Sequence, residues 1–546
     1  MNRTSHRLAA LITGFALSLT GCTLAAPAAD APLSTVTETP DVQPDDPAVT
    51  APPGDPLPTD LPEANPDNPI EVPPPVNPDP TDGPSTPPGG STGNQKGRPN
   101  IVFITTDDMT YSDLKHMPNV RKLLGGNGYT FPNSLSPHPL CCPARAEFVT
   151  GQYGQNNGVH HNTGFYGGYK ALIDPSNTVG RWLNKGGYQT AFVGKYLNGF
   201  KPDKASAVGW TRWNPTYRGV YTYIRTKYYN DGDTKRHTIQ TDDATARYAQ
   251  LYVQEFSQRP QPFFMWVSAL APHTAYLKGK FIPPIPSDRH LGTFNGKNPA
   301  TQKPTYKKSV KKESGRFYQQ RIESLYTVDD TVKDLVDTLR REGELKNTYI
   351  FFTSDNGYLL GEHGIYGKNR LYNEVLNVPL VVRVPGVRTR KVSRKPVTSV
   401  DLPVTFADLG NSIPGRKVDG VSFANILKGK GRAWRDTQLI QTGRRSGNPD
   451  NEGWRQRGVK AGPWVYFARQ ESGKEFLFNR KADPYEITNL ANLPAYSRIL
   501  IEMRNRLSLL ENCAGTGCNR SFGDIPRVRV SATEPEVAPL PEATRP

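Results

Sequence analysis

The sequence predicts an α/β fold, with one large, mostly parallel β-sheet flanked by helices and a smaller C-terminal α+β subdomain. Short apolar runs occur that are typical of strands buried on both faces, amphipathic segments lie between them, and polar residues follow each run. Helices that alternate with buried strands are typical of a parallel sheet between two helical layers.

Four apolar runs are the predicted strands of this sheet: residues 100–105, 189–193, 263–270 and 349–353. The polar side chains that follow them are, in chain order, Asp107 with Asp108, Lys195, His273, and Asp355 with Asn356. Ligand sites of parallel sheets lie beyond the carboxyl ends of the strands. We therefore expect these side chains to meet in one site.

Amphipathic helices are predicted before the third and fourth strands. Tyr248, Tyr252 and Phe256 form one apolar stripe, and a longer stripe runs through residues 322–339. The C-terminal part differs, because its apolar segments 462–467 and 476–478 are short and favour antiparallel strands. We place the boundary between the two parts near residue 430.

Residues 1–22 have the pattern of an export signal. Arg3 and Arg7 precede a short apolar stretch that ends at Leu19. The segment Leu19-Thr20-Gly21-Cys22 resembles the bacterial lipoprotein signal box, which implies that Cys22 is the lipidated first residue of the mature chain. The alternative is an ordinary secretory signal with an incidental cysteine.

Residues 23–97 form a low-complexity segment that holds 20 of the 51 prolines and no aromatic residue. Such a composition buries too little apolar surface to fold, so we expect a disordered linker. Residues 98–430 then form the main domain, 431–530 the C-terminal subdomain and 531–546 a disordered tail. A lipid on Cys22 followed by this linker predicts an extracytoplasmic protein, anchored to the bacterial cell membrane or secreted.

The charge of the chain is unevenly distributed. Its formal net charge is +16, yet residues 23–97 contain twelve acidic residues and one basic residue, so the folded part is strongly basic. A basic domain suggests a polyanionic partner, either a sulfated glycan or a nucleic acid. We expect no nucleic-acid partner, because no recognisable nucleic-acid module is present and the predicted tether places the protein outside the cell.

The five cysteines fit an exported protein. Cys513 and Cys518 enclose four residues and predict a small disulfide, with two unpaired thiols as the alternative. Cys141 and Cys142 are adjacent and belong to no such framework.

A metal site is predicted at two of the strand ends. Asp107, Asp108, Asp355 and Asn356 offer three carboxylates and an amide oxygen, which suit Ca²⁺, or Mg²⁺ as the alternative. For a single aspartate, a helix cap or a turn is the commoner role. For the set, a divalent cation explains how three clustered carboxylates avoid repelling each other.

The segment Cys141-Cys142-Pro143-Ala144-Arg145 resembles the signature Cys-x-Pro-x-Arg of the sulfatases, although two buried structural thiols are the alternative for the cysteines alone. The resemblance covers residues 98–500. Further landmarks that support it are Ser399-Val-Asp-Leu402, Asp419-Gly-Val-Ser422 and Asp483-Pro-Tyr-Glu486. The double cysteine, Gly194-Lys-Tyr-Leu-Asn198 and Ala271-Pro-His273 are most similar to the N-acetylglucosamine-6-sulfatase group.

The resemblance implies an enzyme of the alkaline phosphatase superfamily in which 98–430 is the catalytic domain. A formylglycine-generating enzyme would convert Cys141 to formylglycine (3-oxoalanine), whose hydrate is both a nucleophile and a metal ligand. Arg145, Lys195, His273 and Lys368 match the cations that bind the sulfate, with His273 as the general acid, assisted by Lys368. The implied substrate is a sulfated carbohydrate, such as a 6-sulfated N-acetylglucosamine unit, or a small sulfate ester.

One position departs from the family pattern. Many sulfatases carry a histidine two residues after the Gly-Lys lysine, where this chain has Leu197. Candidates to replace it are Asn198, His160, His161 and His363. Two other functions remain open: a phosphonate or phosphodiester hydrolase of the same superfamily, and a non-catalytic surface lipoprotein that binds polyanionic glycans.

Overall fold

The computed structural model describes residues 97–528 except 203, 309–315, 432 and 446–452. The predicted signal 1–22 with Cys22, the linker up to residue 96 and the tail 531–546 lie outside the described residues. Within the described part, no helix combines the length and the apolar character needed to cross a bilayer.

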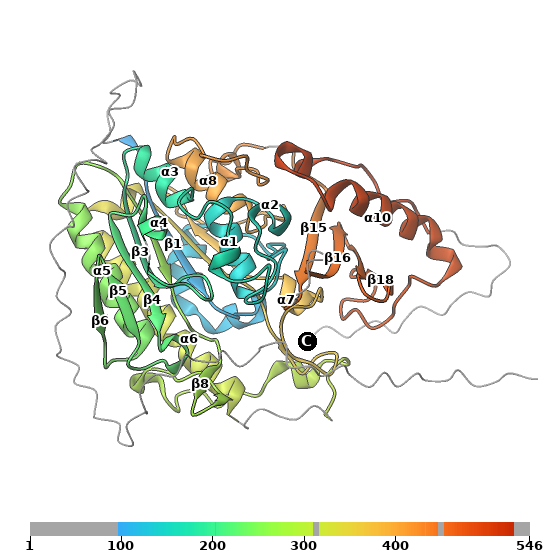
Figure 1. Ribbon diagram of the computed structural model, residues 1–546, viewed down its shortest axis with the longest axis horizontal. Helices are drawn as coiled ribbons and strands as arrows, with labels where there is room; N and C mark the ends of the chain where they lie inside the picture. The colour runs from blue at the N-terminus through green and yellow to red at the C-terminus, as the bar shows by residue number, and fades with distance from the viewer. Residues whose placement is uncertain (1–96, 203, 309–315, 432, 446–452, 529–546) are drawn as a thin grey trace, which may run out of the picture. The chain divides into compact units, whose positions relative to one another are not determined.

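One sheet dominates the fold (Figure 1). Within the described residues its strands follow the order β14 (Lys391–Val392), β2 (Gly128–Thr130), β13 (Leu380–Arg383), β10 (Thr348–Ser354), β1 (Asn100–Thr106), β7 (Phe263–Ser268), β3 (Gln189–Lys195), β4 (Arg212–Arg218), β5 (Lys227–Asn230) and β6 (Asp233–Arg236). Neighbours from β10 to β4 are parallel, whereas β13, β5 and β6 pair antiparallel. The predicted sheet, mostly parallel at its centre, is confirmed.

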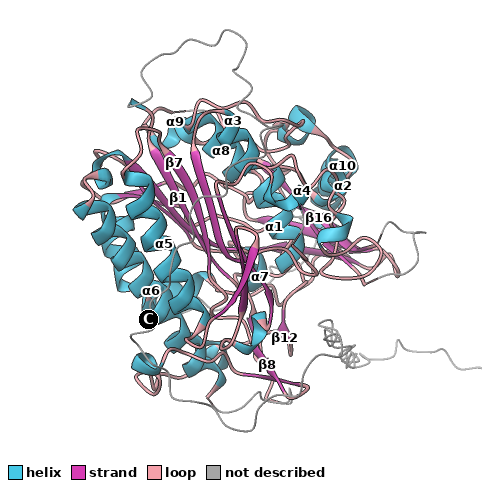
Figure 2. Cartoon of the chain, turned by 60° about the vertical axis from the view of Figure 1, so that its left-hand side comes forward, coloured by secondary structure: helices cyan, strands magenta, loops and turns pink. Residues whose placement is uncertain are grey.

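Helices cover both faces of this sheet, as Figure 2 shows. Val102 and Ile104 of β1 belong to one core cluster, with α5 (Thr241–Ser257) and α6 (Phe317–Arg341). Ile101 and Phe103 belong to the other cluster, which includes residues of α1 (Cys141–Thr150), α3 (Val179–Lys185), α8 (Asp401–Leu409) and α9 (Ala424–Leu427). Side chains of a strand alternate between the faces, so a strand covered on both sides is continuously apolar.

The longest helix shows why the predicted stripes form helices. The apolar residues of α6 at helical spacing are buried, and they are Ile322, Leu325, Val328, Val332, Leu335 and Leu339. Each such side chain contributes about 1.5–3 kcal/mol when it is fully buried. Replacing Leu325 by alanine would therefore cost about 2–5 kcal/mol of stability.

A second, smaller sheet is built from the C-terminal part. Its antiparallel strands are β15 (Thr437–Gly443), β16 (Trp454–Ala461), β17 (Trp464–Arg469) and β18 (Glu475–Asn479). One cluster joins residues of this sheet to α10 (Ser497–Leu510). Another joins Ile440, Val465 and Phe467 to Leu371 and Leu376 of the main part. The predicted C-terminal α+β subdomain is confirmed, and its second cluster anchors it to the main fold.

The remaining regular elements are short. They are α2 (Gly154–Asn157), α4 (Lys204–Ala207) and α7 (Asn373–Leu376), with the two-stranded sheets β8 (Ala275–Leu277) with β9 (Lys280–Ile282) and β11 (Leu359–Leu360) with β12 (Tyr366–Gly367). β12 and α7 flank the segment that contains Lys368, which lies next to the ends of the central strands.

The register of the sheet brings those strand ends level. Thr106 of β1 pairs with Ser354 of β10, and Ser268 of β7 pairs with Thr105 of β1 and with Gly194 of β3. The residues that follow these four strands therefore lie together at the carboxyl ends of the central strands.

Candidate active site

The acidic residues after β1 and β10 form the floor of the site. Asp107, Asp108 and Asp355 are fully buried, and oxygen atoms from all three lie within 4.8 Å of one another. Asp108 adopts a left-handed backbone conformation with φ of 73°, which aspartate tolerates better than most residues. Its backbone is held there because Arg321 Nη2 donates to its carbonyl at 2.6 Å and its own N–H donates to Asp355 at 3.2 Å.

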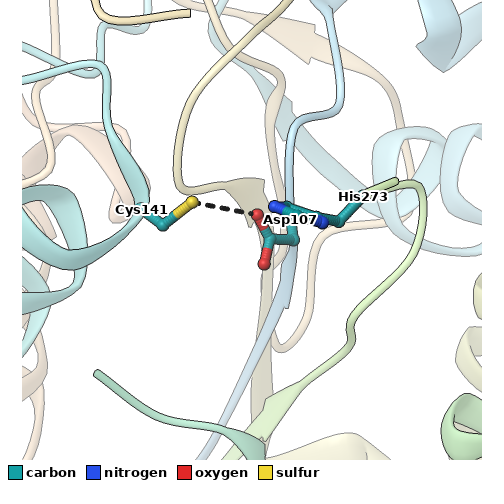
Figure 3. Close-up of side chains that lie close together, drawn as sticks. All are labelled: Asp107, Cys141 and His273. Carbon is teal, nitrogen blue, oxygen red and sulfur yellow. Dashed lines mark hydrogen bonds between the residues drawn. The ribbon is translucent and has the colours of Figure 1, made fainter. Parts of the chain in front are cut away.

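Cys141 is the first residue of α1 and points at this floor. Its Sγ lies 3.4 Å from Asp107 Oδ1 and 2.7 Å from Lys368 Nζ. Figure 3 shows Asp107 between Cys141 and His273, which reaches the carboxylate from the loop after β7. The next residue of the same helix, Cys142, instead packs in the hydrophobic core. The structure therefore brings the first cysteine of the pair, not the second, to the acidic cluster.

Four basic side chains converge on the carboxylates. Lys195, at the end of β3, forms an ion pair with Asp107. Lys368 Nζ lies 2.6 Å from Asp108 Oδ1, and His273 Nε2 lies 3.8 Å from Asp108 Oδ2. Arg145, one turn along α1, places Nε 2.8 Å from Asp355 Oδ2. Each predicted cation is thus in contact with one of the predicted metal ligands.

These cations set the protonation of the carboxylates. Burial alone would raise the pKa of Asp107, but Lys195, His273, Arg145 and Lys368 together hold that pKa well below its usual range. Burial, reinforced by the negative charge of Asp107, raises the pKa of Asp355 to about 6. Burial and Asp107 also raise the pKa of the Cys141 thiol well above its usual value. As a thiol, Cys141 is therefore a poor nucleophile in this setting.

The donor set fits a hard divalent cation. Asn356 Nδ2 donates to Asp108 Oδ1 at 2.6 Å, and its buried Oδ1 has no hydrogen-bond partner among the described residues. An unsatisfied buried amide oxygen beside three carboxylates is what a Ca²⁺ or Mg²⁺ ion would satisfy. Basic groups around such an ion would also bind the oxygens of a tetrahedral oxyanion.

The candidates for the histidine that is missing at Leu197 lie apart from this cluster. His160 stacks on Trp454 with ring centroids 3.9 Å apart, and His363 stacks on Tyr372 at the same distance. His161 Nδ1 bonds within its own loop, to Thr163. Among the described residues, His273 is the histidine that shares a potential ligand group with Asp107 and Cys141.

Asn198, the remaining candidate, contacts Tyr221, a residue of the site that the sequence did not predict. Asn198 Nδ2 donates to the hydroxyl of Tyr221 at 3.0 Å. The Tyr221 ring lies 4.9 Å from Lys195 Nζ and 4.7 Å from the His273 ring. The loop that carries it has no apolar or charge pattern to mark it.

Ser268 is the second residue that sequence reasoning missed. Arg145 Nη1 donates to its Oγ at 2.6 Å. Its position as the last residue of β7 is the one signal that could have identified it. Away from the site, Cys513 and Cys518 form a disulfide.

Two family models match the chain. The model described as Sulfatase matches residues 99–412, which is more than half of the sequence, and the model described as N-sulphoglucosamine sulphohydrolase, C-terminal, matches residues 361–512. The first range contains all the residues of the site described above. The second extends from the segment that carries Lys368 to α10.

Individual proteins are similar at modest identity. The N-acetylglucosamine-6-sulfatase of Capra hircus is 28% identical over 497 residues, covering 79% of this chain and 86% of that protein. The extracellular sulfatase SULF-1 homolog of Drosophila melanogaster is 29% identical over 389 residues, covering 65% of this chain and 34% of that protein. A solved structure of a protein in complex with its substrate D-glucosamine-2-N,6-O-disulfate shares the fold, with a TM-score of 0.63, 20% identity, and coverage of 75% and 97%.

Proposed function

Because the chain belongs to the sulfatase family and is therefore a sulfuric ester hydrolase, we propose that it removes sulfate from sugars by means of a formylglycine formed from Cys141. The observation that carries this proposal is the position of Cys141. Its sulfur lies 2.7 Å from Lys368 Nζ and 3.4 Å from Asp107 Oδ1, at the one edge where four strands deliver carboxylates and cations.

The proposal assigns Asp107, Asp108, Asp355 and Asn356 to a divalent cation, Ca²⁺ or Mg²⁺. Bound there, the cation would offset the repulsion between the carboxylates and polarise a sulfate oxygen, while the hydrated aldehyde at position 141 would supply the attacking hydroxyl. A sulfate ester is already an anion, so attack by an oxygen nucleophile needs positive charge around it. Arg145, Lys195 and Lys368 provide that charge from the protein.

His273 is suited to protonate the leaving sugar oxygen. Its Nδ1 lies 2.7 Å from the carbonyl of Thr274, so the proton on that nitrogen is fixed and Nε2 faces the acidic cluster. A protonated Nε2 can donate to the bridging oxygen as the ester bond breaks. Lys368, 2.6 Å from Asp108 Oδ1, orients the same region and helps to neutralise the negative charge.

The proposed substrate is a 6-sulfated glucosamine unit of a glycan. Support comes from the Capra hircus relative, which is named for the 6-sulfate of N-acetylglucosamine, and from the structural neighbour that binds a 6-O-sulfated glucosamine. We also propose that the protein acts outside the cytoplasm, anchored through a lipid on Cys22. One Drosophila relative is named an extracellular sulfatase, and the signal at residues 1–22 is consistent with export.

Peptide mass spectrometry across Cys141, on protein co-expressed with a formylglycine-generating enzyme, tests the nucleophile. We expect the aldehyde at position 141 and release of sulfate from N-acetylglucosamine-6-sulfate. Cys141→Ser should lower the turnover number by at least about a thousandfold. Cys142→Ser is the matched control and should retain the aldehyde, because Cys142 packs in the core.

Three outcomes would contradict the proposal. An unmodified thiol together with full sulfatase activity would exclude the formylglycine nucleophile. Faster turnover of a phosphonate monoester or a phosphodiester than of any sulfate ester would favour the alternative hydrolase of the same superfamily. Tight glycan binding without any turnover would favour the non-catalytic lipoprotein.

A further inference from the structure

A cavity of about 530 Å³ lies where the small sheet meets the main part of the fold. One wall comes from the main part, and the other comes from the turn between β16 and β17 and from the residues after β18. The polar residues that line it are Asn133, Asn377, Arg394, Lys460, Arg480 and Lys481. Its volume is in the range of sites that bind small molecules, so it can accept a sugar unit.

The charge of this cavity is unbalanced. Four of the side chains that line it are cationic, and no acidic side chain is among the described residues of its lining. Outside the lining, the Glu486 carboxylate forms a long ion pair, with Oε1 3.9 Å from Arg480 Nε. Such a separation is too long for a hydrogen bond.

Lys460 is buried and Arg480 is partly buried, and neither forms a close ion pair with a carboxylate among the described residues. Lys460 is 8% exposed, and its Nζ donates to the carbonyl of Gly462 at 3.2 Å. Arg480 Nε is buried and has no hydrogen-bond partner among the described residues. Burial lowers the pKa of Lys460 to about 8, with a further contribution from Arg480. A buried ammonium such as that of Lys460, without a close counter-charge, is unfavourable, and a bound anion would relieve that cost.

The walls of the cavity are held in place by hydrogen bonds. Asn377 Nδ2 donates to the carbonyls of Pro132 at 3.0 Å and Ser134 at 2.8 Å. Asn133 Nδ2 donates to the carbonyl of Arg394 at 2.7 Å. The backbone N–H of Arg480 donates to Pro463 at 2.8 Å, which joins β18 to the β16–β17 turn. Binding an anion here therefore requires little ordering of the backbone.

We infer that this cavity is a second anion site, separate from Cys141, that binds a sulfate or carboxylate group on a sulfated glycan chain. The choice of a sulfated glycan as the occupant rests on the proposed function, whereas the anion site itself rests on the residues above. None of its residues belongs to the catalytic cluster. The segment that follows Asn133 does lead there, because Ser136 Oγ donates to the carbonyl of Asp355 at 2.5 Å and Cys141 begins α1 shortly after.

Fluorescence anisotropy with a labelled heparin hexasaccharide tests this inference on the full chain. Arg394 and Lys481 are exposed, so the double variant Arg394→Glu with Lys481→Glu should fold and should weaken hexasaccharide binding by at least about tenfold. The matched control is Lys185→Glu with Lys346→Glu, two exposed lysines before β3 and β10 at the opposite edge of the sheet. We expect less than about a twofold change for the control.

Lys460→Met is a second variant, which should weaken binding while it stabilises the protein. Removing an unpaired buried charge while keeping the side-chain volume should raise the melting temperature and still weaken hexasaccharide binding. A merely structural role for Lys460 predicts a lower melting temperature instead. That result, combined with unchanged binding, would overturn the assignment of Lys460.

Competition experiments distinguish the sources of the anion. Inorganic sulfate and inorganic phosphate should displace the labelled hexasaccharide only at concentrations well above the concentration at which an unlabelled sulfated oligosaccharide displaces it. Stronger competition by either free ion, or by phosphatidylglycerol vesicles, would overturn the glycan as the occupant. Equal losses in the Arg394→Glu, Lys481→Glu double variant and in the control would show a diffuse charge effect and overturn the site. Because the assay measures binding, it is independent of whether the protein hydrolyses sulfate esters.

Discussion

At the scale of single residues, Arg145 joins more of the active site than any other side chain described above. Its Nε lies 2.8 Å from Asp355, and its Nη1 donates to Ser268 Oγ and to the carbonyl of Lys195, both at 2.6 Å. Its Nη2 has no hydrogen-bond partner among the described residues and lies 3.4 Å from Asp107. The guanidinium thus connects the ends of three strands and retains one donor for a bound oxyanion.

Arg145→Lys should therefore lower the turnover number by about a hundredfold to a thousandfold, since a single ammonium cannot replace a planar fork of donors. The measurement is sulfate release from an aryl sulfate, with the aldehyde content of each preparation determined by mass spectrometry and used to correct the rate. Ser268→Ala is the control, because it removes one of the three bonds and should cost about 0.5–1.5 kcal/mol of stability. Equal rates for Arg145→Lys and the unaltered protein would contradict this role.

The residues of the site differ in how far the sequence could predict them. Asp107, Lys195 and Asp355 follow directly after uninterrupted apolar runs, and a charged residue in that place can only lie at the carboxyl edge of the sheet. Tyr221 lies in a loop without any pattern, so its contact with His273 requires the folded chain.

At the scale of elements, the central strands could be predicted because burial on both faces makes their sequences continuously apolar. The strands at one edge of the sheet could not be predicted. β14 has two residues, both exposed, and β2 has three. Such short segments have no periodicity, and the pairing of β2 with β13 and of β14 with β2 depends on tertiary contacts.

The start of α5 positions the loop that carries His273. Asp242, buried in the first turn of the helix, accepts hydrogen bonds from the backbone N–H groups of Leu270 at 2.7 Å and Ala271 at 3.2 Å. Asp242→Ala leaves both donors unsatisfied and should cost about 1–3 kcal/mol of stability. It should also lower the turnover number more than it raises KM, because the proposed mechanism gives His273 the protonation of the leaving group.

Asp242→Asn separates positioning from a general loss of stability. The asparagine keeps one acceptor oxygen and should restore part of the turnover number. If the alanine and asparagine variants lose activity in proportion to their melting temperatures alone, Asp242 has only a structural role. Steady-state kinetics and thermal unfolding on the same preparations decide between the two.

The two strand ends that carry the acidic residues should respond to removal of the proposed divalent cation. Without an ion, Asp107, Asp108 and Asp355 repel one another, so chelation with EDTA should lower the melting temperature and abolish activity. Restored Ca²⁺ or Mg²⁺ at about a hundred times its dissociation constant should raise the unfolding free energy by about 2.7 kcal/mol. Differential scanning calorimetry measures this shift independently of turnover.

A matched pair of variants locates the ion. Asp108→Ala should remove the cation-dependent shift, whereas Asp288→Ala, which alters an exposed aspartate in a short 3-10 helix before α6, should retain it. An identical shift in both variants would mean that the ion binds elsewhere.

At the scale of the whole molecule, the small sheet is not an independent appendage. Val465, Phe467, Phe476 and Phe478 share one core cluster with Leu371 and Leu376, which lie just after Lys368. The C-terminal part thereby supports the segment that places Lys368 beside Cys141. The sequence could predict the two parts but not this contact, nor the cavity between them, because the residues that meet there are far apart in the sequence.

The cavity between the two parts should make glycan binding depend on pH. Burial raises the pKa of Glu486 to about 7, against the opposing effect of Arg480 and with smaller contributions from Glu374 and Asp483. Burial, followed by Arg480 and opposed by Glu486, sets the pKa of Lys460 at about 8. Below both values Glu486 is neutral and Lys460 is charged, so the cavity has its highest positive charge.

Raising the pH first ionises Glu486 and then neutralises Lys460, and both changes remove positive charge, whereas glycan sulfates stay ionised. We therefore expect the dissociation constant of the heparin hexasaccharide to rise by about tenfold or more between about pH 6 and pH 9 at constant ionic strength. Glu486→Gln should remove the lower step of this profile, and Lys460→Met should remove the upper step. An unchanged affinity across this range would contradict the cavity as the binding site, because neither Lys460 in its lining nor Glu486 beside it would then affect the interaction.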